Sequence, residues 1–200
     1  MKIKICGLTS PVEATYLNNK PVDYAGMVLF FEKSKRNISL DRAKEIMAVL
    51  DSRIKRVAVV VSPDVDQMRL ICNSGFDIVQ VHGGLSAEVI DACTINIWKA
   101  FNVSDMDTQS IFADQEKITG FVFDGARPGS GQSFCYDLLE SIDRDSKRLF
   151  ILAGGLNPDN VAQAIEQVKP DVVDVSSGVE YKDRPGKNPS LVDEFVSVCN

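Results

Sequence analysis

The segment LFILAGGLNPDNVAQAIEQVKPDVVDVSSG, residues 149–178, holds two short apolar runs with a helical pattern between them. Leu149–Leu152 and Val172–Val175 have the length and the apolar content of buried strands. Between them, apolar residues recur at helical spacing at Val161, Ala164, Ile165 and Val168, which gives the helix one apolar face. Two strands joined by a helix form a βαβ unit, and this connection makes the two strands parallel.

The same alternation of apolar runs and helical patterns extends over the whole chain. Eight runs are predicted strands: Lys2–Cys6, Tyr24–Phe30, Lys55–Val61, Ile78–Val81, Thr94–Phe101, Gly120–Phe123, Leu149–Leu152 and Val172–Val175. Eight strand-helix units in 200 residues leave about 25 residues for each unit, which is short but sufficient for a parallel (β/α)8 barrel. We therefore predict an α/β fold of the TIM-barrel class, with a doubly wound sheet as the alternative.

No linker, charge block or low-complexity stretch divides the chain, so we expect residues 1–200 to form a single barrel domain. Four helices are predicted to begin at an N-cap side chain followed by proline: Ser10-Pro11, Ser62-Pro63, Asn157-Pro158 and Asn188-Pro189. Ser10 and Glu13 also have the spacing of a capping box. The last helix, Pro189–Cys199, is expected to close the fold.

The composition is that of a globular protein, with 44% hydrophobic and 25% charged residues. The longest apolar run, Tyr24–Phe31, is much shorter than a membrane-spanning helix requires, and the N-terminus has no signal-peptide core. A net charge of -6 provides no broad basic surface for nucleic acid or an anionic membrane. We therefore expect a cytoplasmic protein that binds a small molecule and has no nucleic acid or membrane as a partner.

The five cysteines are not arranged as metal ligands or as a disulfide framework. They show no CxxC spacing and no cluster with histidine, and an odd number does not suit paired disulfides; their positions are Cys6, Cys72, Cys93, Cys135 and Cys199. The sequence therefore predicts reduced thiols and no metal site.

In a barrel of this class the chemistry lies at the C-terminal ends of the strands. Polar residues or glycines follow six of the predicted strands, at Cys6-Gly7, Arg36, His82-Gly83, Asp124-Gly125, Gly154-Gly155 and Ser176-Ser177-Gly178. Because parallel strands end at the same face, we expect these residues to meet at one end of the barrel.

Cys6 is the first candidate for proton transfer. In the strand Lys2–Cys6 the side chains alternate, so Ile3 and Ile5 are expected to face the helices and Cys6 to point inward with the two lysines. A nearby ammonium group favours the thiolate, which would make Cys6 a base or nucleophile near neutral pH. The alternative is a small buried residue without a chemical role.

Asp124 ends an apolar run and precedes the glycine-rich stretch GARPGSG, residues 125–131. An acid beside such a loop loses water when the loop closes, which raises its pKa and suits it to donate a proton. Gly129 and Gly131 are then expected to line the site. The alternative is an aspartate that serves a turn or a helix cap.

Two consecutive loops have the composition of a phosphate site. Gly154 and Gly155 follow the seventh predicted strand, and Ser176, Ser177 and Gly178 follow the eighth. Barrels commonly bind phosphate in these two loops, where glycines let backbone N–H groups approach the anion and a short extra helix points its positive end at it. We predict phosphate binding at these residues.

Three further polar residues have two interpretations each. Arg36 is suited to hold a carboxylate through two hydrogen bonds, and the alternative is a solvated surface arginine. Any Ser-His-Asp or multi-histidine metal chemistry would depend on His82 alone, because it is the single histidine, and the favoured interpretation is a hydrogen-bonded structural residue that lines the site. Lys99 could form a Schiff base, but it shares its parity with Ile95 and Ile97, which predicts that it faces the helices.

These fragments, in this order along the chain, resemble the phosphoribosylanthranilate isomerase family. The matching stretches are KICGLT (residues 4–9), QVHG (80–83), WKAF (98–101), LAGGLNP (152–158) and DVSSGVE (174–180). They extend over nearly the full chain, and the combination of the first with the last is the specific part.

The resemblance implies an enzyme of tryptophan biosynthesis with a (β/α)8 fold. Its reaction is the Amadori rearrangement of N-(5-phosphoribosyl)anthranilate to 1-(2-carboxyphenylamino)-1-deoxyribulose 5-phosphate, without cofactor or metal. The resemblance further implies that Cys6 is the general base, that Asp124 is the general acid and that Arg36 contacts the anthranilate carboxylate. It places phosphate on the glycines of the last two loops and leaves open an association with other enzymes of the tryptophan pathway.

Three positions depart from the family pattern. The family usually has proline where this chain has Lys35, an acidic residue where it has Gly84, and lysine where it has Gln132. None of the three removes a proposed catalytic group. Two other hypotheses stay open: another phosphosugar isomerase or lyase on the same kind of barrel, the lyase requiring a lysine at the barrel mouth, and a phosphate-binding barrel without catalysis.

Overall fold

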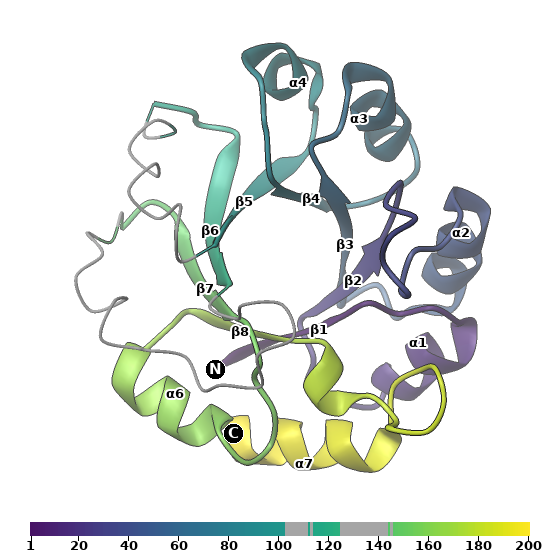
Figure 1. Ribbon diagram of the computed structural model, residues 1–200, viewed down its shortest axis with the longest axis vertical. Coiled ribbons are helices and arrows are strands. Elements are labelled where there is room, and N and C mark those ends of the chain that lie inside the picture. Colours follow the sequence, from purple (N-terminus) through teal and green to yellow (C-terminus); the bar gives the residue numbers. More distant parts are fainter. Residues whose placement is uncertain (103–111, 113, 125–143, 145) are drawn as a thin grey trace.

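Eight parallel strands form one closed barrel, in the order β1-β2-β3-β4-β5-β6-β7-β8 (Figure 1). The structure, a computed structural model, describes residues 1–102, 112, 114–124, 144 and 146–200. Pairing of β1 (Lys2–Cys6) with β8 (Val172–Val175) closes the barrel, with Lys2 opposite Val172. The strand order follows the sequence without a reversal, so the barrel prediction is confirmed and the doubly wound sheet is excluded.

The observed strands agree with the predicted ones to within two residues at every end. The six strands between β1 and β8 are β2 (Tyr24–Val28), β3 (Lys55–Val61), β4 (Ile78–His82), β5 (Asn96–Asn102), β6 (Ile118–Asp124) and β7 (Leu149–Ala153). The second strand ends before Phe30 because the backbone of Phe30 turns into the left-handed region, with a φ of 56°.

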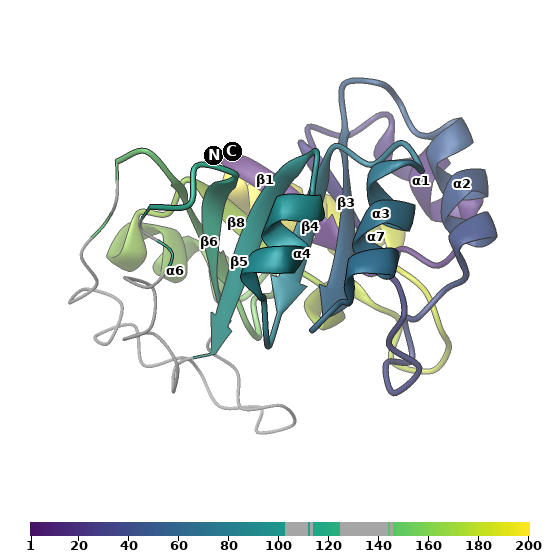
Figure 2. The ribbon, with the colours of Figure 1, turned by 90° about the horizontal axis from the view of Figure 1, so that it is seen from above.

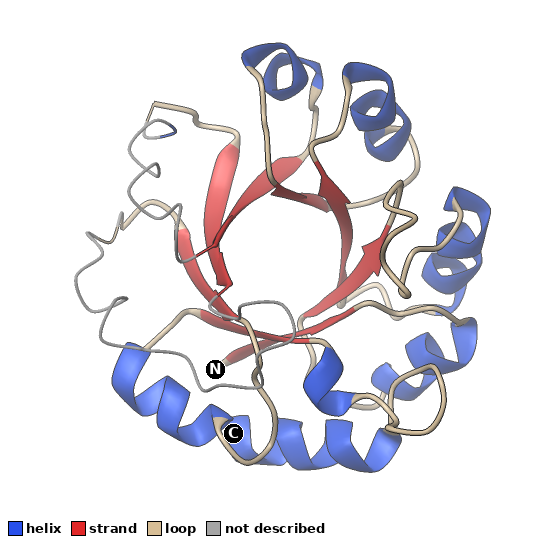
Figure 3. Ribbon diagram, viewed as in Figure 1, coloured by secondary structure: helices blue, strands red, loops and turns tan. Residues whose placement is uncertain are grey.

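Helices surround the barrel on the outside (Figure 3). They are α1 (Pro11–Leu17), α2 (Leu40–Val49), α3 (Val65–Cys72), α4 (Ala87–Ala92), α6 (Val161–Val168) and α7 (Pro189–Cys199), and a short 3-10 helix, η2 (Ser177–Val179), follows β8. Seen from the side, both ends of the chain lie at the opposite end of the barrel from the arrowheads of β3 and β5 (Figure 2). None of the helices in the described ranges has the length and apolar content to cross a membrane.

Apolar side chains fill two separate layers. One cluster lies inside the barrel and includes Trp98, Val122 and Ile151. The other lies between the sheet and the helices and includes Ile3 and Ile5. Cys6 belongs to the inner cluster, so the alternation predicted for the first strand is confirmed.

Two of the four predicted helix starts are correct. α1 follows Ser10 and α7 follows Asn188, each with proline in the first turn. The prediction at Ser62-Pro63 is wrong, because α3 begins at Val65 and the carboxylate of Asp64 caps it by accepting from the Gln67 N–H at 2.8 Å. The Ser62 hydroxyl is used elsewhere, since it accepts from the Gly84 N–H at 2.9 Å.

The prediction at Asn157-Pro158 is also wrong, because α6 begins at Val161. The side-chain oxygen of Asn157 accepts from the N–H groups of Asp159, at 2.8 Å, and Asn160, at 3.2 Å. Asn157 therefore caps a turn that precedes the helix rather than the helix itself.

Candidate active site

The C-terminal ends of the strands bring together the residues predicted to carry chemistry. Cys6 ends β1, His82 ends β4 and Asp124 ends β6. Arg36 lies in the segment after β2, and the two glycine loops follow β7 and β8. Because all eight strands are parallel, these ends open at one mouth of the barrel.

A buried ion pair lies inside the barrel near this mouth. The ammonium nitrogen of Lys4 donates to Asp174 Oδ2 at 2.8 Å and connects β1 with β8. Lys4 is fully buried. The second oxygen of Asp174, Oδ1, is buried and accepts no hydrogen bond from the residues that the structure describes. A buried acceptor of this kind is suited to a donor from a bound ligand, such as a hydroxyl group.

Cys6 lies next to this pair, and its protonation differs from the prediction. Burial raises the pKa of the Cys6 thiol more than the neighbouring Lys4 lowers it, and the charge of Asp174 raises it further. Lys187 opposes this increase only weakly. Cys6 is therefore a thiol at neutral pH in the ligand-free barrel, and the predicted resting thiolate is wrong. The alternation of side chains along the strand predicts that a lysine ammonium group lies near Cys6. It cannot predict how deeply Cys6 is buried, or that Asp174 lies beside it.

Gly26 of β2 makes room for both side chains. A Cβ atom at this position would lie 2.9 Å from Cys6 Sγ and 3.2 Å from Lys4 Nζ. A larger residue would therefore have to displace the thiol or the ammonium group.

Arg36 is bound to a carboxylate of the protein itself. Its Nε donates to Glu180 Oε1 at 2.5 Å and its second guanidinium nitrogen donates to Oε2 at 3.0 Å. Lys35 and Lys187 each lie 3.0 Å from the same carboxylate. Burial alone would raise the pKa of Glu180, but Arg36 and the two lysines lower it to about 2.

This corner of the mouth has an excess of positive charge, because three cations face one carboxylate. Arg36 is half-buried and paired, so the interpretation as a solvated surface arginine is wrong. The third cation is Lys35, which is exposed and stands where the family usually has proline. Glu180 could not be predicted as the partner of Arg36, because it lies 144 residues away along the chain.

Lys187, which was not predicted as a site residue, connects this corner to the last loops. Its ammonium group donates to the Ser176 carbonyl at 3.1 Å, and its backbone N–H donates to Glu13 Oε1 at 2.6 Å. The other oxygen of Glu13 accepts from the N–H groups of Thr9, at 2.6 Å, and Ser10, at 2.9 Å, as the predicted capping box requires. No local motif marks Lys187, since its function depends on this three-dimensional arrangement.

The two glycine loops are in direct contact. A Cβ atom on Gly178 would lie 2.0 Å from the Leu156 carbonyl oxygen, so only glycine fits where the loop after β8 passes the loop after β7. Gly154 and Gly155 have φ values of 93° and 67°, and a Cβ atom on Gly155 would meet open space. Ser176 donates from its hydroxyl to the Cys6 carbonyl at 3.0 Å, and Ser177 begins η2, the short extra helix expected here.

Asp124 is half-buried at the end of β6 and is opposite Asn102 of β5 and Ala153 of β7. It has the same strand parity as Val122, which lies inside the barrel. Gly129 and Gly131, which were expected to line the site, lie outside the described residues, and so does Gln132.

His82 is a hydrogen-bonded histidine, as predicted. The amide nitrogen of Gln80 lies 2.9 Å from His82 Nε2 and donates to it. Burial, with smaller contributions from the cations Lys4 and Lys99, lowers the pKa of His82 to about 4. The imidazole is therefore neutral at physiological pH.

Lys99 lies on the outer side of β5, as its parity predicted. Its ammonium group donates to the Ala100 carbonyl at 2.6 Å and lies 4.8 Å from the centre of the Phe101 ring, which belongs to the outer core. A Schiff base on Lys99 would therefore form on the helix-facing side of the sheet and not at the barrel mouth. Lys99 is thus not the lysine that the lyase hypothesis requires.

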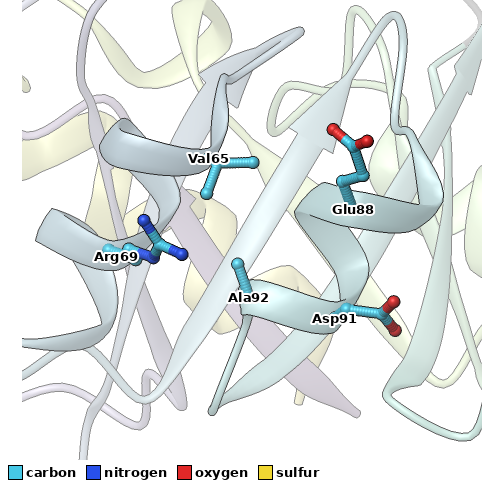
Figure 4. Close-up of a pocket in the computed structure, with 5 residues that line it drawn as sticks. All are labelled: Val65, Arg69, Glu88, Asp91 and Ala92. Atoms are coloured by element: carbon cyan, nitrogen blue, oxygen red, sulfur yellow. The ribbon is translucent and has the colours of Figure 1, made fainter.

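One pocket lies away from the strand ends, and no metal-ligand cluster is found in the described ranges. A pocket of about 500 Å³ lies between α3 and α4 on the outside of the barrel, lined by Val65, Arg69, Glu88, Asp91 and Ala92 (Figure 4). It is formed by helices and not by strand ends. No group of three His, Cys, Asp or Glu side chains within the described ranges is placed to hold a metal ion.

Comparison with known proteins agrees with this geometry. Residues 3–198 match the family model described as N-(5'phosphoribosyl)anthranilate (PRA) isomerase. A similar protein is the N-(5'-phosphoribosyl)anthranilate isomerase of Clostridium beijerinckii, which is 34% identical over 99% of this chain and 95% of its own length.

The chain is also similar to solved structures of phosphoribosyl anthranilate isomerases. The phosphoribosyl anthranilate isomerase of Thermotoga maritima is 32% identical, with a TM-score of 0.85 over 99% of this chain and 98% of its own. Another phosphoribosyl anthranilate isomerase, solved with reduced 1-(o-carboxyphenylamino)-1-deoxyribulose 5-phosphate, is 31% identical, with a TM-score of 0.82 over 98% of this chain and 97% of its own.

Proposed function

The chain belongs to the N-(5'-phosphoribosyl)anthranilate isomerase family, and from that premise we propose how its residues carry out the reaction. The protein is an isomerase of tryptophan biosynthesis that converts N-(5-phosphoribosyl)anthranilate to 1-(2-carboxyphenylamino)-1-deoxyribulose 5-phosphate. A relative solved with the reduced form of that product supports this assignment. The reaction needs one group that gives a proton and another that takes one, at different atoms of the same sugar.

We propose that Asp124 protonates the ribose ring oxygen, which opens the ring to a Schiff base. Cys6 then removes the proton from C2, and the resulting enolamine becomes the ketose product. The observation that carries this proposal is the inward position of both side chains at one barrel mouth, on β1 and β6. Two groups on separate strands can act on two separate atoms of the sugar.

Cys6 must lose its proton before it can act as the base. Lys4 and Lys187 favour the thiolate, while burial and Asp174 disfavour it. Turnover therefore proceeds through the thiolate fraction that these opposing effects leave. The buried ammonium group of Lys4 serves as a positioning residue, since it acts through the thiol rather than on the sugar.

The two anionic groups of the substrate have separate sites in this proposal. Arg36 binds the anthranilate carboxylate, which shares the guanidinium group with Glu180 or displaces it, and Lys35 adds charge nearby. The phosphate lies between the loops after β7 and β8, against the N–H groups of Gly154, Gly155, Ser176, Ser177 and Gly178. Close contact between these loops, together with Lys187 beside Ser176, supports the phosphate site.

We also propose that the enzyme works in the cytoplasm, in association with other enzymes of the pathway. The cysteines that the structure describes are all free thiols, which suits a reducing compartment. An association would limit the diffusion of the phosphorylated substrate and product between consecutive steps.

The test generates the substrate in situ with excess anthranilate phosphoribosyltransferase and follows the loss of its fluorescence when this protein is added. Wild type is expected to remove the fluorescence, while Cys6→Ala and Asp124→Asn each lower kcat at least about 100-fold. Arg36→Met is expected chiefly to raise KM, by about tenfold or more, because it removes a charged hydrogen-bond pair.

Lys33→Met provides the control for the arginine, because Lys33 is exposed on the same segment. It is expected to leave KM unchanged. Full turnover in folded Cys6→Ala or Asp124→Asn would refute the corresponding role, and an unchanged KM in Arg36→Met would remove this residue from the carboxylate site. If folded wild type leaves the fluorescence intact, the protein acts on another phosphosugar or binds phosphate without catalysis.

A further inference from the structure

Two cysteines meet at the end of the barrel opposite the strand ends. Cys72 is the last residue of α3 and Cys93 directly follows α4, and their sulfur atoms lie 3.8 Å apart. Helices that follow strands return to the N-terminal face of a barrel, so this thiol pair lies far from the mouth that holds Cys6. Twenty-one positions separate the two cysteines along the chain, and the contact arises from the packing of neighbouring helices.

The helices that carry the pair lie side by side. Arg69 of α3 and Ala92 of α4 line the same groove between the helices (Figure 4). Each of these residues is close to its cysteine in sequence, Arg69 one turn before Cys72 and Ala92 directly before Cys93. A covalent bond between the sulfur atoms would therefore join two helices that are already neighbours.

The two thiols have different surroundings. Cys72 is half-buried, and its sulfur accepts from the Thr94 N–H at 3.4 Å. Cys93 is 1% exposed, and its S–H donates to the Ile95 carbonyl at 3.2 Å. Burial, with the neighbouring Cys72, raises the pKa of Cys93 to about 12. Cys72 is thus the accessible sulfur, and Cys93 is the protected one.

A second pocket lies beside Cys93. It has a volume of about 630 Å³ and is lined by Cys93, Thr94, Ile95 and Lys117, among others. Its other lining residues are Asn96, the first residue of β5, and Phe76, Asp77 and Glu116, which lie in the segments before β4 and β6, so the pocket lies at the N-terminal face.

We propose that Cys72 and Cys93 form a reactive dithiol, which low-molecular-weight disulfides such as glutathione disulfide convert reversibly into an intramolecular disulfide. In the first step the Cys72 thiolate attacks one sulfur of glutathione disulfide and releases one glutathione, which takes the proton lost by Cys72. In the second step Cys93 loses its proton, attacks Cys72 Sγ and releases the second glutathione. Two protein thiols are oxidised, and one disulfide molecule is reduced to two thiols.

Disulfide formation requires the two sulfur atoms to approach from 3.8 Å to about 2.05 Å. The attacking species in thiol–disulfide exchange is the thiolate, so the reaction is expected to become faster as the pH rises.

The experiment uses the whole protein and a glutathione buffer of increasing oxidised fraction. After the remaining thiols are blocked with an alkylating agent, trypsin releases residues 70–99 as one peptide that contains both cysteines. In oxidised wild type this peptide is expected to have lost two hydrogen atoms and to carry no alkyl group and no glutathione. Dithiothreitol should restore two alkylation sites.

Matched variants separate the two steps. Cys93→Ser is expected to keep one glutathione on Cys72, because the resolving thiol is absent, while Cys72→Ser should remain unmodified at Cys93. The disulfide is expected to raise the unfolding temperature by about 6 °C and to leave isomerase kcat unchanged, since the bond closes a loop remote from the mouth.

Three results would overturn the proposal. The first is a folded wild-type protein whose peptide still takes two alkyl groups in the most oxidising buffer. The second is a wild-type protein that holds glutathione on Cys72 without resolving it, and the third is one that crosslinks Cys72 to a cysteine outside residues 70–99. The wild-type measurement is decisive even if a variant fails to fold.

Discussion

At the scale of single residues, the buried ion pair between Lys4 and Asp174 is expected to be sensitive to substitution. The pair is 2.8 Å long and lies inside the barrel, where Lys4 has no access to water. Asp174→Asn would leave the ammonium group buried without a counter-charge. We expect the free energy of unfolding to fall by about 3–5 kcal/mol, measured by urea denaturation.

The control for this variant removes the aspartate of a surface ion pair. Asp66 and Arg69 lie 3.5 Å apart on α3, and the carboxylate is 89% exposed. Asp66→Asn is expected to change the free energy of unfolding by less than about 0.5 kcal/mol. If both variants lose the same small amount, the buried pair contributes no more than a surface pair and the argument from burial fails.

The same residues show what a sequence can and cannot reveal about a site. The inward direction of Cys6 was predictable because the alternation of side chains along a strand is fixed by the backbone. Its protonation state was not, because Asp174 lies on a strand 170 residues away. The partners of Arg36 and Lys187 were hidden for the same reason: ion pairs across a barrel leave no local pattern.

At the scale of structural elements, the contact between the last two glycine loops is open to a direct test. In Gly178→Ala the new methyl group would lie 2.0 Å from the Leu156 carbonyl, so one loop must move. Because we propose that phosphate binds between these loops, KM is expected to rise about tenfold or more with a smaller change in kcat. Steady-state kinetics measures both values.

Gly75→Ala is the matched control for the loop variant. Gly75 also has a positive φ, 88°, but a Cβ atom there would meet nothing within 4 Å. It is expected to cost about 1 kcal/mol of stability through backbone strain and to leave KM unchanged. An unchanged KM in folded Gly178→Ala would contradict the proposed position of the phosphate.

The ends of the strands could be predicted from local sequence, whereas two of the helix starts could not. Strand ends were predicted to within two residues because apolar runs report burial directly. Helix starts at Ser62 and Asn157 were not, since several residues nearby can cap a helix. At α3 the carboxylate of Asp64 provides the cap, and Ser62 instead binds Gly84, whose approach depends on the next strand of the barrel.

At the scale of the whole molecule, the barrel itself follows from local patterns. Repeated strand-helix units with short connections make each strand the neighbour of the next, which the sequence shows directly. Closure does not follow from any single unit, because it depends on the pairing of β1 with β8. That pairing also creates the site, since it brings Cys6 to Ser176 and Lys4 to Asp174.

A last prediction concerns the stability of the folded barrel as the pH falls. The pKa of His82 is about 4 in the folded protein, against an ordinary value of 6.5, so the unfolded chain binds a proton at a higher pH than the folded chain does. Stability is therefore complete above pH 6.5 and falls as the pH decreases from 6.5 toward 4, by up to about 3 kcal/mol. His82→Gln removes this contribution. Urea denaturation at several pH values should show that the free energy of unfolding of wild type, relative to that of His82→Gln, falls as the pH decreases across this interval. Parallel pH profiles of the two proteins would contradict the lowered pKa.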